Sequence, residues 1–259
     1  EEGIHVPLFL LRPRQGAARP PVVVAVAQGG KERFLASRSA ELTDLLRAGV
    51  AVCLADVRGT GETTPNASLE RLASLEFDLG RNLLGARLKD LRTVLAWLRT
   101  QQDLDPTRIA LWGESFSPPN PETLFLDELE NEMGPQIQRR ADLTGPHLAL
   151  FAALYEPALQ TTIARGALAS YQSILAEPFT YTSLDATILG ILKVADISDI
   201  AAAIGPTKIH LENQVDGRNI ARFPKASNLL SILTTVLRAQ NSRDSTVYSV
   251  CQVLELGRS

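Results

Sequence analysis

The chain has 259 residues, 45% of them hydrophobic, which is enough for one large buried core. Its formal net charge of -3 gives no electrostatic reason to expect nucleic-acid binding. No apolar run approaches the roughly 18 residues of a membrane span, and no cysteine and histidine cluster has metal-site spacing. Two cysteines, Cys53 and Cys251, are too few for a disulfide framework. We predict a single α/β domain over residues 1–259, with no metal or other cofactor and no nucleic-acid or membrane partner.

Two apolar runs rich in β-branched residues predict the first strands of a parallel sheet. One is residues 22–27, followed by Gln28-Gly29-Gly30, and the other is residues 50–55, followed by a loop over residues 56–63. Continuous apolar runs are typical of strands that are covered on both faces. The paired glycines allow backbone N–H groups to approach a ligand closely. Between the two strands, residues 42–49 predict the end of a helix at a C-terminal glycine.

The segment from residue 88 to residue 117 is the most informative part of the sequence. Apolar residues three and four positions apart predict a helix over residues 88–99, which the Asp105-Pro106 break follows. A short apolar strand over residues 109–112 then leads into Gly113-Glu114-Ser115-Phe116-Ser117. Ser117 stands where a second glycine is usual in this pattern. The pattern predicts a sharp strand-to-helix turn, a nucleophile elbow, that projects the Ser115 hydroxyl from the end of the sheet.

An insertion is predicted around residues 117–145, because it opens with Pro118-Pro119-Asn120-Pro121, which cannot continue a helix directly from the turn. It contains an acidic stretch over residues 127–132, which either shapes the mouth of the site or is a solvated surface excursion. A helix resumes over residues 146–154. The next strands are expected near residues 162–168, 208–211 and 245–250.

The helix, break, strand and Gly-x-Ser turn together resemble the α/β-hydrolase superfamily. Residues 22–30 fit the strand and oxyanion loop of that family, and residues 196–211 resemble its late helix and penultimate strand. Asp56-Val57-Arg58-Gly59-Thr60-Gly61 looks like the Asp-x-Arg-Gly-x-Gly loop of acetyl xylan esterase-like and dienelactone hydrolase-like members. The resemblance extends from Val6 to about Asn219. It implies an α/β-hydrolase fold, with a mostly parallel sheet and helices on both faces.

The resemblance also implies hydrolysis of a carboxylic ester through an acyl-enzyme, with Ser115 as nucleophile. The expected substrate is a small-molecule or carbohydrate ester such as an acetyl group on xylan, which would imply a secreted or periplasmic protein. A serine needs a base within hydrogen-bond reach, and that base needs an orienting acid. Asp216 falls where the family places this acid, and Glu212 is the alternative. Asp216 before Gly217 is also a turn signal by itself.

The catalytic base is the missing element of the predicted triad. The chain has three histidines, at positions 5, 147 and 210, and all of them precede Asp216, whereas the family order is serine, acid, histidine. His147, at a predicted helix start after the insertion, is our candidate base. Three explanations stay open: the base lies beyond Ser259 in a longer, multidomain protein, an unusual histidine serves, or the domain no longer catalyses.

The oxyanion hole is predicted from the same resemblance. The backbone N–H of Phe116 and an N–H from the loop Gly29, Gly30 and Lys31 would hold the developing negative charge. The sequence thus leads to two hypotheses, a serine esterase and a catalytically impaired hydrolase domain with a binding or structural role.

Overall fold

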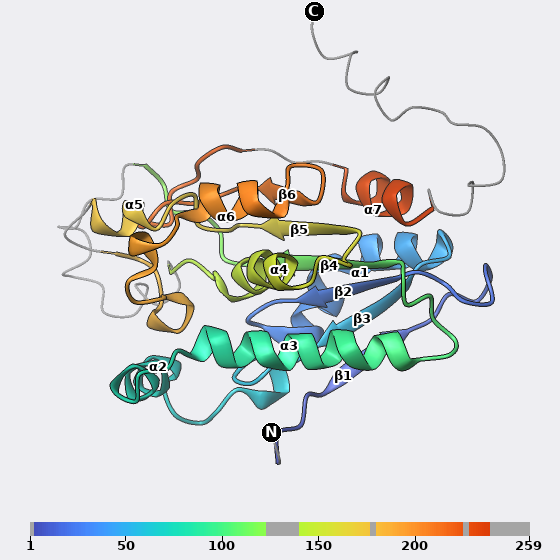
Figure 1. Cartoon of the computed structure of the whole chain (residues 1–259), viewed down its shortest axis with the longest axis horizontal. Coiled ribbons are helices and arrows are strands. Elements are labelled where there is room, and N and C mark those ends of the chain that lie inside the picture. Colours follow the sequence, from blue (N-terminus) through green and yellow to red (C-terminus); the bar gives the residue numbers. More distant parts are fainter. Residues whose placement is uncertain (1–2, 123–139, 177–179, 225–227, 239–259) are drawn as a thin grey trace, which may run out of the picture.

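The computed structural model describes residues 3–122, 140–176, 180–224 and 228–238. Six strands form one sheet in the order β1-β3-β2-β4-β5-β6 (Figure 1). Strand β1 is antiparallel to β3, and the other neighbouring pairs are parallel. The strands are β1 (Leu8–Leu11), β2 (Val22–Val26), β3 (Ala51–Ala55), β4 (Ile109–Glu114), β5 (Thr161–Arg165) and β6 (Ile209–Glu212).

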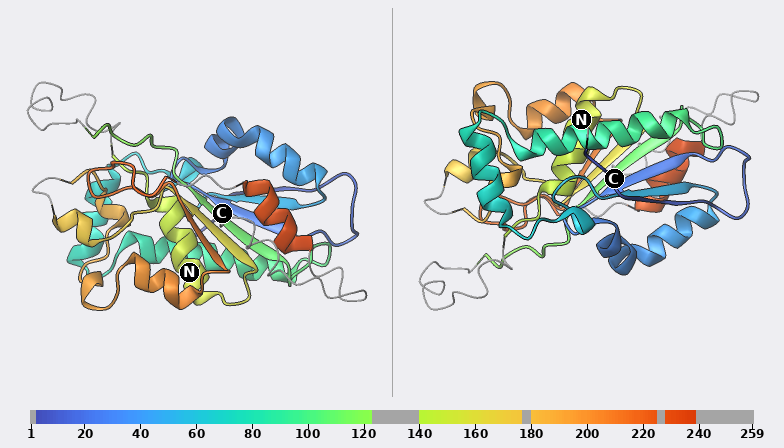
Figure 2. Two further views of the ribbon diagram at one scale, coloured as in Figure 1. Left: turned by 90° about the horizontal axis from the view of Figure 1, so that it is seen from above. Right: turned by 90° about the horizontal axis from the view of Figure 1, so that it is seen from below.

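Helices cover both faces of this sheet (Figure 2). On one face, Val22 and Val24 of β2 belong to a core shared with α3 (Leu83–Thr100), α4 (Thr144–Tyr155) and α6 (Ile197–Ile204). On the other face, the alternate residues Val23 and Ala25 share a core with α1 (Gly30–Arg47) and α7 (Leu229–Arg238). Successive side chains of a strand point to opposite faces, so an apolar run such as β2 supplies both cores. The predicted fold class is confirmed.

The remaining helical segments are short and lie in the connections. Among the described residues they are α2 (Leu69–Asp78), α5 (Gln172–Leu175) and the 3-10 turns η1 (Gly61–Thr63), η4 (Leu184–Ala186) and η5 (Ile191–Lys193). The helix end predicted over residues 42–49 belongs to the longer α1, which ends at Arg47. Cys53 is buried in β3, and burial raises the pKa of its thiol to about 12. The strand expected over residues 245–250, Cys251 and the acidic stretch 127–132 lie outside the described residues.

The structure does not form the predicted nucleophile elbow. After β4, Ser115 continues the strand pairing, because its backbone N–H donates to the Arg165 carbonyl at 2.9 Å. Within the described chain, the non-glycine residues with positive φ are Asn213, Asn219 and Phe223, so Ser115 does not have the strained backbone of an elbow. Within the described chain, the next helix, α4, begins at Thr144. Pro118 and Pro119 have no backbone N–H to donate, so a helix cannot continue through them directly from Ser115.

Helix α4 nevertheless lies where a helix after β4 should lie, against the sheet. Its Gly145 is so close to the ends of β2 and β4 that a Cβ there would overlap the carbonyl oxygens of Val26 and Glu114. Gly113 of β4 faces the same contact, since a Cβ on it would overlap the Gly145 carbonyl. Among the residues described here, no helix is both long and apolar enough to cross a membrane.

Candidate active site

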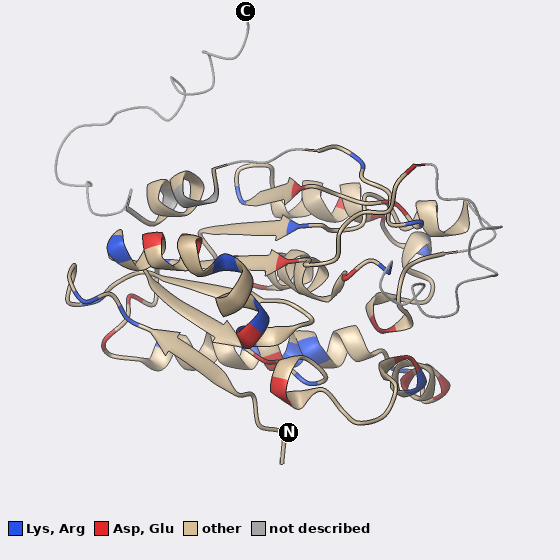
Figure 3. Cartoon of the chain, turned by 180° about the vertical axis from the view of Figure 1, so that it is seen from behind, with Lys and Arg blue, Asp and Glu red and all other residues tan. Residues whose placement is uncertain are grey.

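The carboxyl ends of the parallel strands carry the polar residues of the candidate site. Strands β4, β5 and β6 end at Glu114, Arg165 and Glu212, and the register places these three residues side by side. Figure 3 shows acidic, basic and acidic colours at the tips of the three neighbouring strands. In open α/β sheets this edge is where ligands bind.

Four charged side chains form a connected row at this edge. Arg38 of α1 donates to Glu114 at 2.7 Å, and the next pair, Arg165 and Glu114, is 3.5 Å apart. Arg165 also pairs with Glu212 at 2.7 Å. Burial raises the pKa of the Glu114 carboxyl, and the charges and hydrogen bonds of Arg165, Arg38 and Trp112 oppose that rise. The row therefore balances two cations against two carboxylates with little exposure to solvent.

Ser115 opens into a pocket of about 230 Å³ beside this row. Its hydroxyl oxygen accepts a long hydrogen bond, 3.4 Å, from the Ser117 backbone N–H. Gly166 approaches the serine closely, because a Cβ on Gly166 would lie 2.5 Å from the Ser115 Cβ. The pocket is lined by Arg38, Glu114, Ser115, Ser117, Pro119, Arg165, Gly166, Asn213, Val215, Ala221 and Pro224. Sequence reasoning thus found a serine at a pocket, although not on an elbow.

Asp216, the predicted triad acid, is held in the loop after β6 by its own neighbours. One carboxylate oxygen accepts the backbone N–H groups of Arg218 at 2.9 Å and Ile220 at 3.0 Å. The other oxygen pairs with Arg222 at 2.9 Å. Val215 lines the Ser115 pocket, whereas Asp216 is not among its lining residues. The side chain stabilises a turn, and Glu212, the alternative acid, is buried and paired with Arg165.

His147, the candidate base, lies in the first turn of α4 and is fully buried away from the pocket lining. Its Nε2 accepts the Leu168 backbone N–H at 3.3 Å, and its Nδ1 lies 3.4 Å from the Tyr171 hydroxyl. Burial lowers the pKa of the imidazole to about 4. His210 lies within β6, and His5 is exposed before β1. The structure therefore does not bring Ser115, His147 and Asp216 together as a triad.

Two of the predicted oxyanion donors in the loop after β2 are bonded within the protein. The Gly30 N–H donates to the Ala27 carbonyl at 3.1 Å, and the Lys31 N–H donates to Asp56 at 2.7 Å. Gly29 is the residue that precedes α1. The buried Lys31 ammonium pairs with Asp56 and Glu62, each at 2.8 Å, so this lysine fastens the loop after β3 to α1. Of the expected loop donors, the N–H groups of Gly30 and Lys31 are therefore already engaged within the protein.

Phe116, the remaining predicted donor, faces a carboxyl group that the sequence reasoning missed. Its backbone N–H points to Oδ2 of Asp142 at 3.5 Å. Burial raises the pKa of Asp142 to about 7; the Phe116 N–H opposes this rise, and the nearby charge of Asp185 adds to it. An acidic residue just before a predicted helix start was the available signal. Its contact with Phe116 joins residues that are far apart in the sequence.

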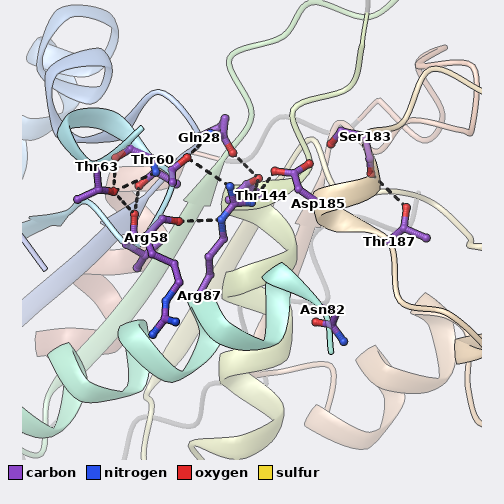
Figure 4. Close-up of polar contacts among 12 residues, drawn as sticks. Gln28, Arg58, Thr60, Thr63, Asn82, Arg87, Thr144, Ser183, Asp185 and Thr187 are labelled. Carbon is purple, nitrogen blue, oxygen red and sulfur yellow. Dashed lines mark hydrogen bonds and ion pairs between the residues drawn. The ribbon is translucent and has the colours of Figure 1, made fainter. Parts of the chain in front are cut away.

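A second buried polar cluster, shown in Figure 4, contains Arg87 and Asp185, whose charges act on Asp142. Arg87 of α3 donates to Asp185 at 2.6 Å and to the Thr144 hydroxyl at 3.1 Å. Thr144 in turn donates to the Gln28 side-chain oxygen at 2.8 Å. This cluster joins α3, α4, η4 and the end of β2, and it fixes the loops of the carboxyl edge. The described residues contain no group of acidic, histidine and cysteine side chains suited to a metal ion.

The sheet order, the two helical layers and the polar carboxyl edge define an α/β-hydrolase fold, and solved structures of this fold are similar to the chain. A candidate acetyl xylan esterase from Bacteroides fragilis matches with a TM-score of 0.61 and 14% identity, over 90% of this chain and 60% of that one. Est1E from Butyrivibrio proteoclasticus, solved with ferulic acid bound, has a TM-score of 0.50 and 12% identity, over 93% and 95% of the two chains. A glucuronoyl esterase from Solibacter usitatus matches with a TM-score of 0.50 and 12% identity, over 90% of this chain and 65% of that one.

Comparison by sequence gives a shorter match. The quorum-quenching protein AidA of Acinetobacter baumannii is 28% identical over 110 residues, 42% of this chain and 31% of AidA. No protein-family model matches the chain. The chain spans 60% of the length of the Bacteroides structure, and its match covers less than a third of AidA. The resemblance to the candidate acetyl xylan esterase and to the glucuronoyl esterase is therefore one of fold.

Proposed function

We propose that this chain is a hydrolase-fold domain that binds a ligand at the Ser115 pocket and does not hydrolyse esters through a serine triad. The observation that carries the proposal is that the groups a triad would need make other bonds. Asp216 is paired with Arg222, and the His147 ring is bonded between Leu168 and Tyr171. A serine hydroxyl without a nearby base is a weak nucleophile at neutral pH. Loss of a triad member typically reduces turnover by about 10⁴ or more.

The lining of the pocket supports a polyhydroxylated ligand such as a carbohydrate or its acyl ester. Arg38 and Arg165 supply donors, whereas Glu114 supplies acceptors, and their charges already balance one another. A balanced row offers no net attraction for an ion, but it offers hydrogen bonds of both kinds to neutral hydroxyl groups. The esterase-type relatives with this fold are consistent with such a ligand.

Ester hydrolysis by Ser115 is the second candidate function. The favouring observation is that its hydroxyl lines a pocket at the sheet edge where hydrolases of this fold carry out catalysis. This hypothesis needs a base from outside the three histidines placed above.

A labelling experiment distinguishes the two functions. Wild type and Ser115→Ala are treated with a fluorophosphonate probe and assayed on p-nitrophenyl acetate. We expect no labelling of Ser115 and the same slow hydrolysis rate in both proteins, since no described group activates the hydroxyl. Labelling that disappears in Ser115→Ala, together with loss of hydrolysis, would establish the esterase and reject our proposal.

Binding is tested separately with acetylated xylobiose by calorimetric titration. Ser115→Ala keeps the pocket open, whereas Ser115→Leu fills it, because Gly166 leaves no space beside the serine. We expect Ser115→Ala to bind like wild type and Ser115→Leu to lose binding. Equal affinity in all three proteins, or no binding to any of them, would remove the carbohydrate part of the proposal.

A further inference from the structure

A second pocket, of about 450 Å³, lies where α2, η4 and the start of α4 meet. Leu69, Ala141 and Leu143 supply apolar walls, and buried Asp185 and Thr144 supply a polar floor. At its rim, Arg140 and Glu70 form an ion pair. The Ser115 pocket shares none of its lining residues with this one.

The polar floor of this second pocket is satisfied internally. Arg87 donates hydrogen bonds to the Asp185 carboxylate and the Thr144 hydroxyl, and this hydroxyl donates to the side-chain oxygen of Gln28 (Figure 4). The other two guanidinium nitrogens of Arg87 donate hydrogen bonds to the backbone carbonyls of Arg58 and Gly59. These side chains therefore form a rigid floor whose charges cancel, with little hydrogen-bonding capacity left for a ligand.

Asp142, on the wall of the same pocket, is satisfied only in part. Its carboxylate interacts with the backbone N–H of Phe116, 3.5 Å from Oδ2, and with the backbone N–H of Thr144. Its Oδ1 is buried without a hydrogen-bond partner among the described residues. A carboxylate has about four acceptor positions, and leaving them unused in a buried place costs free energy. Rotation about the Cβ–Cγ bond is soft, so either oxygen can turn toward the pocket. A buried carboxylate oxygen that lacks a hydrogen-bond donor within the protein can be stabilised by a donor on a bound ligand.

We propose that this pocket binds a small molecule carrying one primary ammonium group on a short alkyl chain, with Asp142 as the anionic partner. Among the charged residues that line the pocket, Asp185, Glu70 and Arg140 are in ion pairs, and Asp142 is in none of the ion pairs of the described chain. The nearby Arg87 offsets its charge only in part, because Arg87 is paired with Asp185. An ammonium supplies donors and the opposite charge together, and charge-assisted hydrogen bonds are the stronger kind. The alkyl chain would pack against Leu69 and Leu143. This site is separate from the one proposed to bind carbohydrate.

The ionisation of Asp142 gives this binding a pH dependence. Its pKa is raised to about 7 by burial, and the charged groups that face it are Asp185 of η4, Arg87 of α3, Glu70 of α2 and Arg140. An alkylammonium stays protonated up to about pH 10, as lysine does. Only the ionised carboxylate attracts it. With a pKa of about 7, the ionised fraction, and hence the affinity, should be about tenfold lower at pH 6 than at pH 8.

The proposal is tested by titrating the whole chain with n-butylammonium and following the backbone amide signals of Phe116 and Thr144 by NMR. The uncharged probe 1-butanol is the ligand control. Asp142→Asn is the test variant, and Asp78→Asn, which changes an exposed carboxylate of α2 outside the pocket lining, is its matched control. We expect saturable shifts with wild type at pH 8. We expect affinity at least about tenfold lower in Asp142→Asn, since a charge-assisted contact is lost, and within about twofold of wild type in Asp78→Asn.

Three results would overturn the proposal: no saturable shift with n-butylammonium, equal affinity in Asp142→Asn, or binding of 1-butanol as tight as that of the ammonium. If Asp142→Asn does not fold, the wild-type titrations at pH 6 and pH 8 decide the question. An affinity that does not fall at pH 6 rejects Asp142 as the partner.

Discussion

Three ionisable side chains near the carboxyl edge are buried and tied to partners inside the protein. Lys31 is paired with Asp56, Glu114 with Arg38, and His147 is bonded between a backbone N–H and a tyrosine. Burial of such groups costs free energy unless they are paired or neutral. At the residue scale, these side chains act on the stability of the fold, and His147 and Lys31 each lead to a prediction.

His147 should make the protein sensitive to acid. Its folded-state pKa of about 4 lies below the ordinary value of 6.5, so the unfolded chain takes up the proton first. The stability contributed by the neutral ring is complete above about pH 6.5 and is lost as the pH falls toward 4, by up to about 3 kcal/mol. Urea unfolding of wild type and His147→Gln between pH 7 and pH 4 measures this. Identical pH slopes in the two proteins would contradict it.

Lys31 should be essential for stability although it is not placed for catalysis. Lys31→Met leaves the fully buried Asp56 without its cation, a change that typically costs about 3–5 kcal/mol. Thermal unfolding of Lys31→Met measures the loss. Lys193→Met, at an exposed position of η5, is the control and should leave Tm nearly unchanged. If the two variants have the same Tm, the buried pair does not have the role assigned to it.

At the scale of elements, the contact between α4 and β4 decides the geometry of the sheet edge. Gly113 and Gly145 face each other across this contact, and a side chain on either would overlap backbone atoms of the other element or its neighbours. Gly113 also begins the Gly-x-Ser pattern. Because Gly113 has no side chain, α4 can pack closely against β4, whereas the turn that the pattern predicts is not formed.

Gly145→Ala should separate α4 from the sheet. The added methyl group meets backbone carbonyls of two strands that cannot move aside, and we expect a loss of about 3 kcal/mol. Gly80→Ala is the control, because nothing lies near that Cβ and only its positive φ is unfavourable, at about 1 kcal/mol. Chemical denaturation of both variants measures the difference. Equal losses would show that the close contact does not constrain the helix.

At the scale of the whole molecule, the sheet separates two cores, and α7 closes the smaller one. Leu233 and Leu237 of α7 are fully buried in the core that contains Phe34 and Trp112. Arg108, before β4, donates to the Leu237 carbonyl and so holds the same helix. The second face of the sheet therefore depends on residues close to the end of the described chain.

Leu233→Ala should weaken this closure. Removing a buried leucine side chain typically lowers the free energy of unfolding by about 2–5 kcal/mol. The fluorescence of Trp112, which lies in the same core, should change as the packing loosens. Ser231→Ala, at an exposed position of the same helix, is the control and should have little effect. Unchanged stability in Leu233→Ala would mean that α7 is not part of the cooperative core.

The sheet could be predicted from the sequence because its strands are continuous apolar runs, and burial on both faces leaves little freedom in such segments. The site could be predicted only in part. Ser115 lies at a pocket, but the path of the chain after it depends on Pro118-Pro119 and on how α4 packs against β4. A five-residue pattern contains neither of these. The bonds that hold His147 and Asp142 join distant segments, so the sequence alone could not place them.

The alternating charges of Glu114, Arg165 and Glu212 have a consequence for folding as well as for the pocket. If β4 paired directly with β6, two carboxylates would meet at the sheet edge, which would be repulsive. A register slip of one residue would turn Arg165 toward the opposite face, which would leave Glu212 buried without its cation and Glu114 with Arg38 alone. Apolar runs alone would tolerate several strand orders. The three strand tips therefore favour one neighbour and one alignment for each strand, and they discriminate against misassembled sheets before any ligand is present.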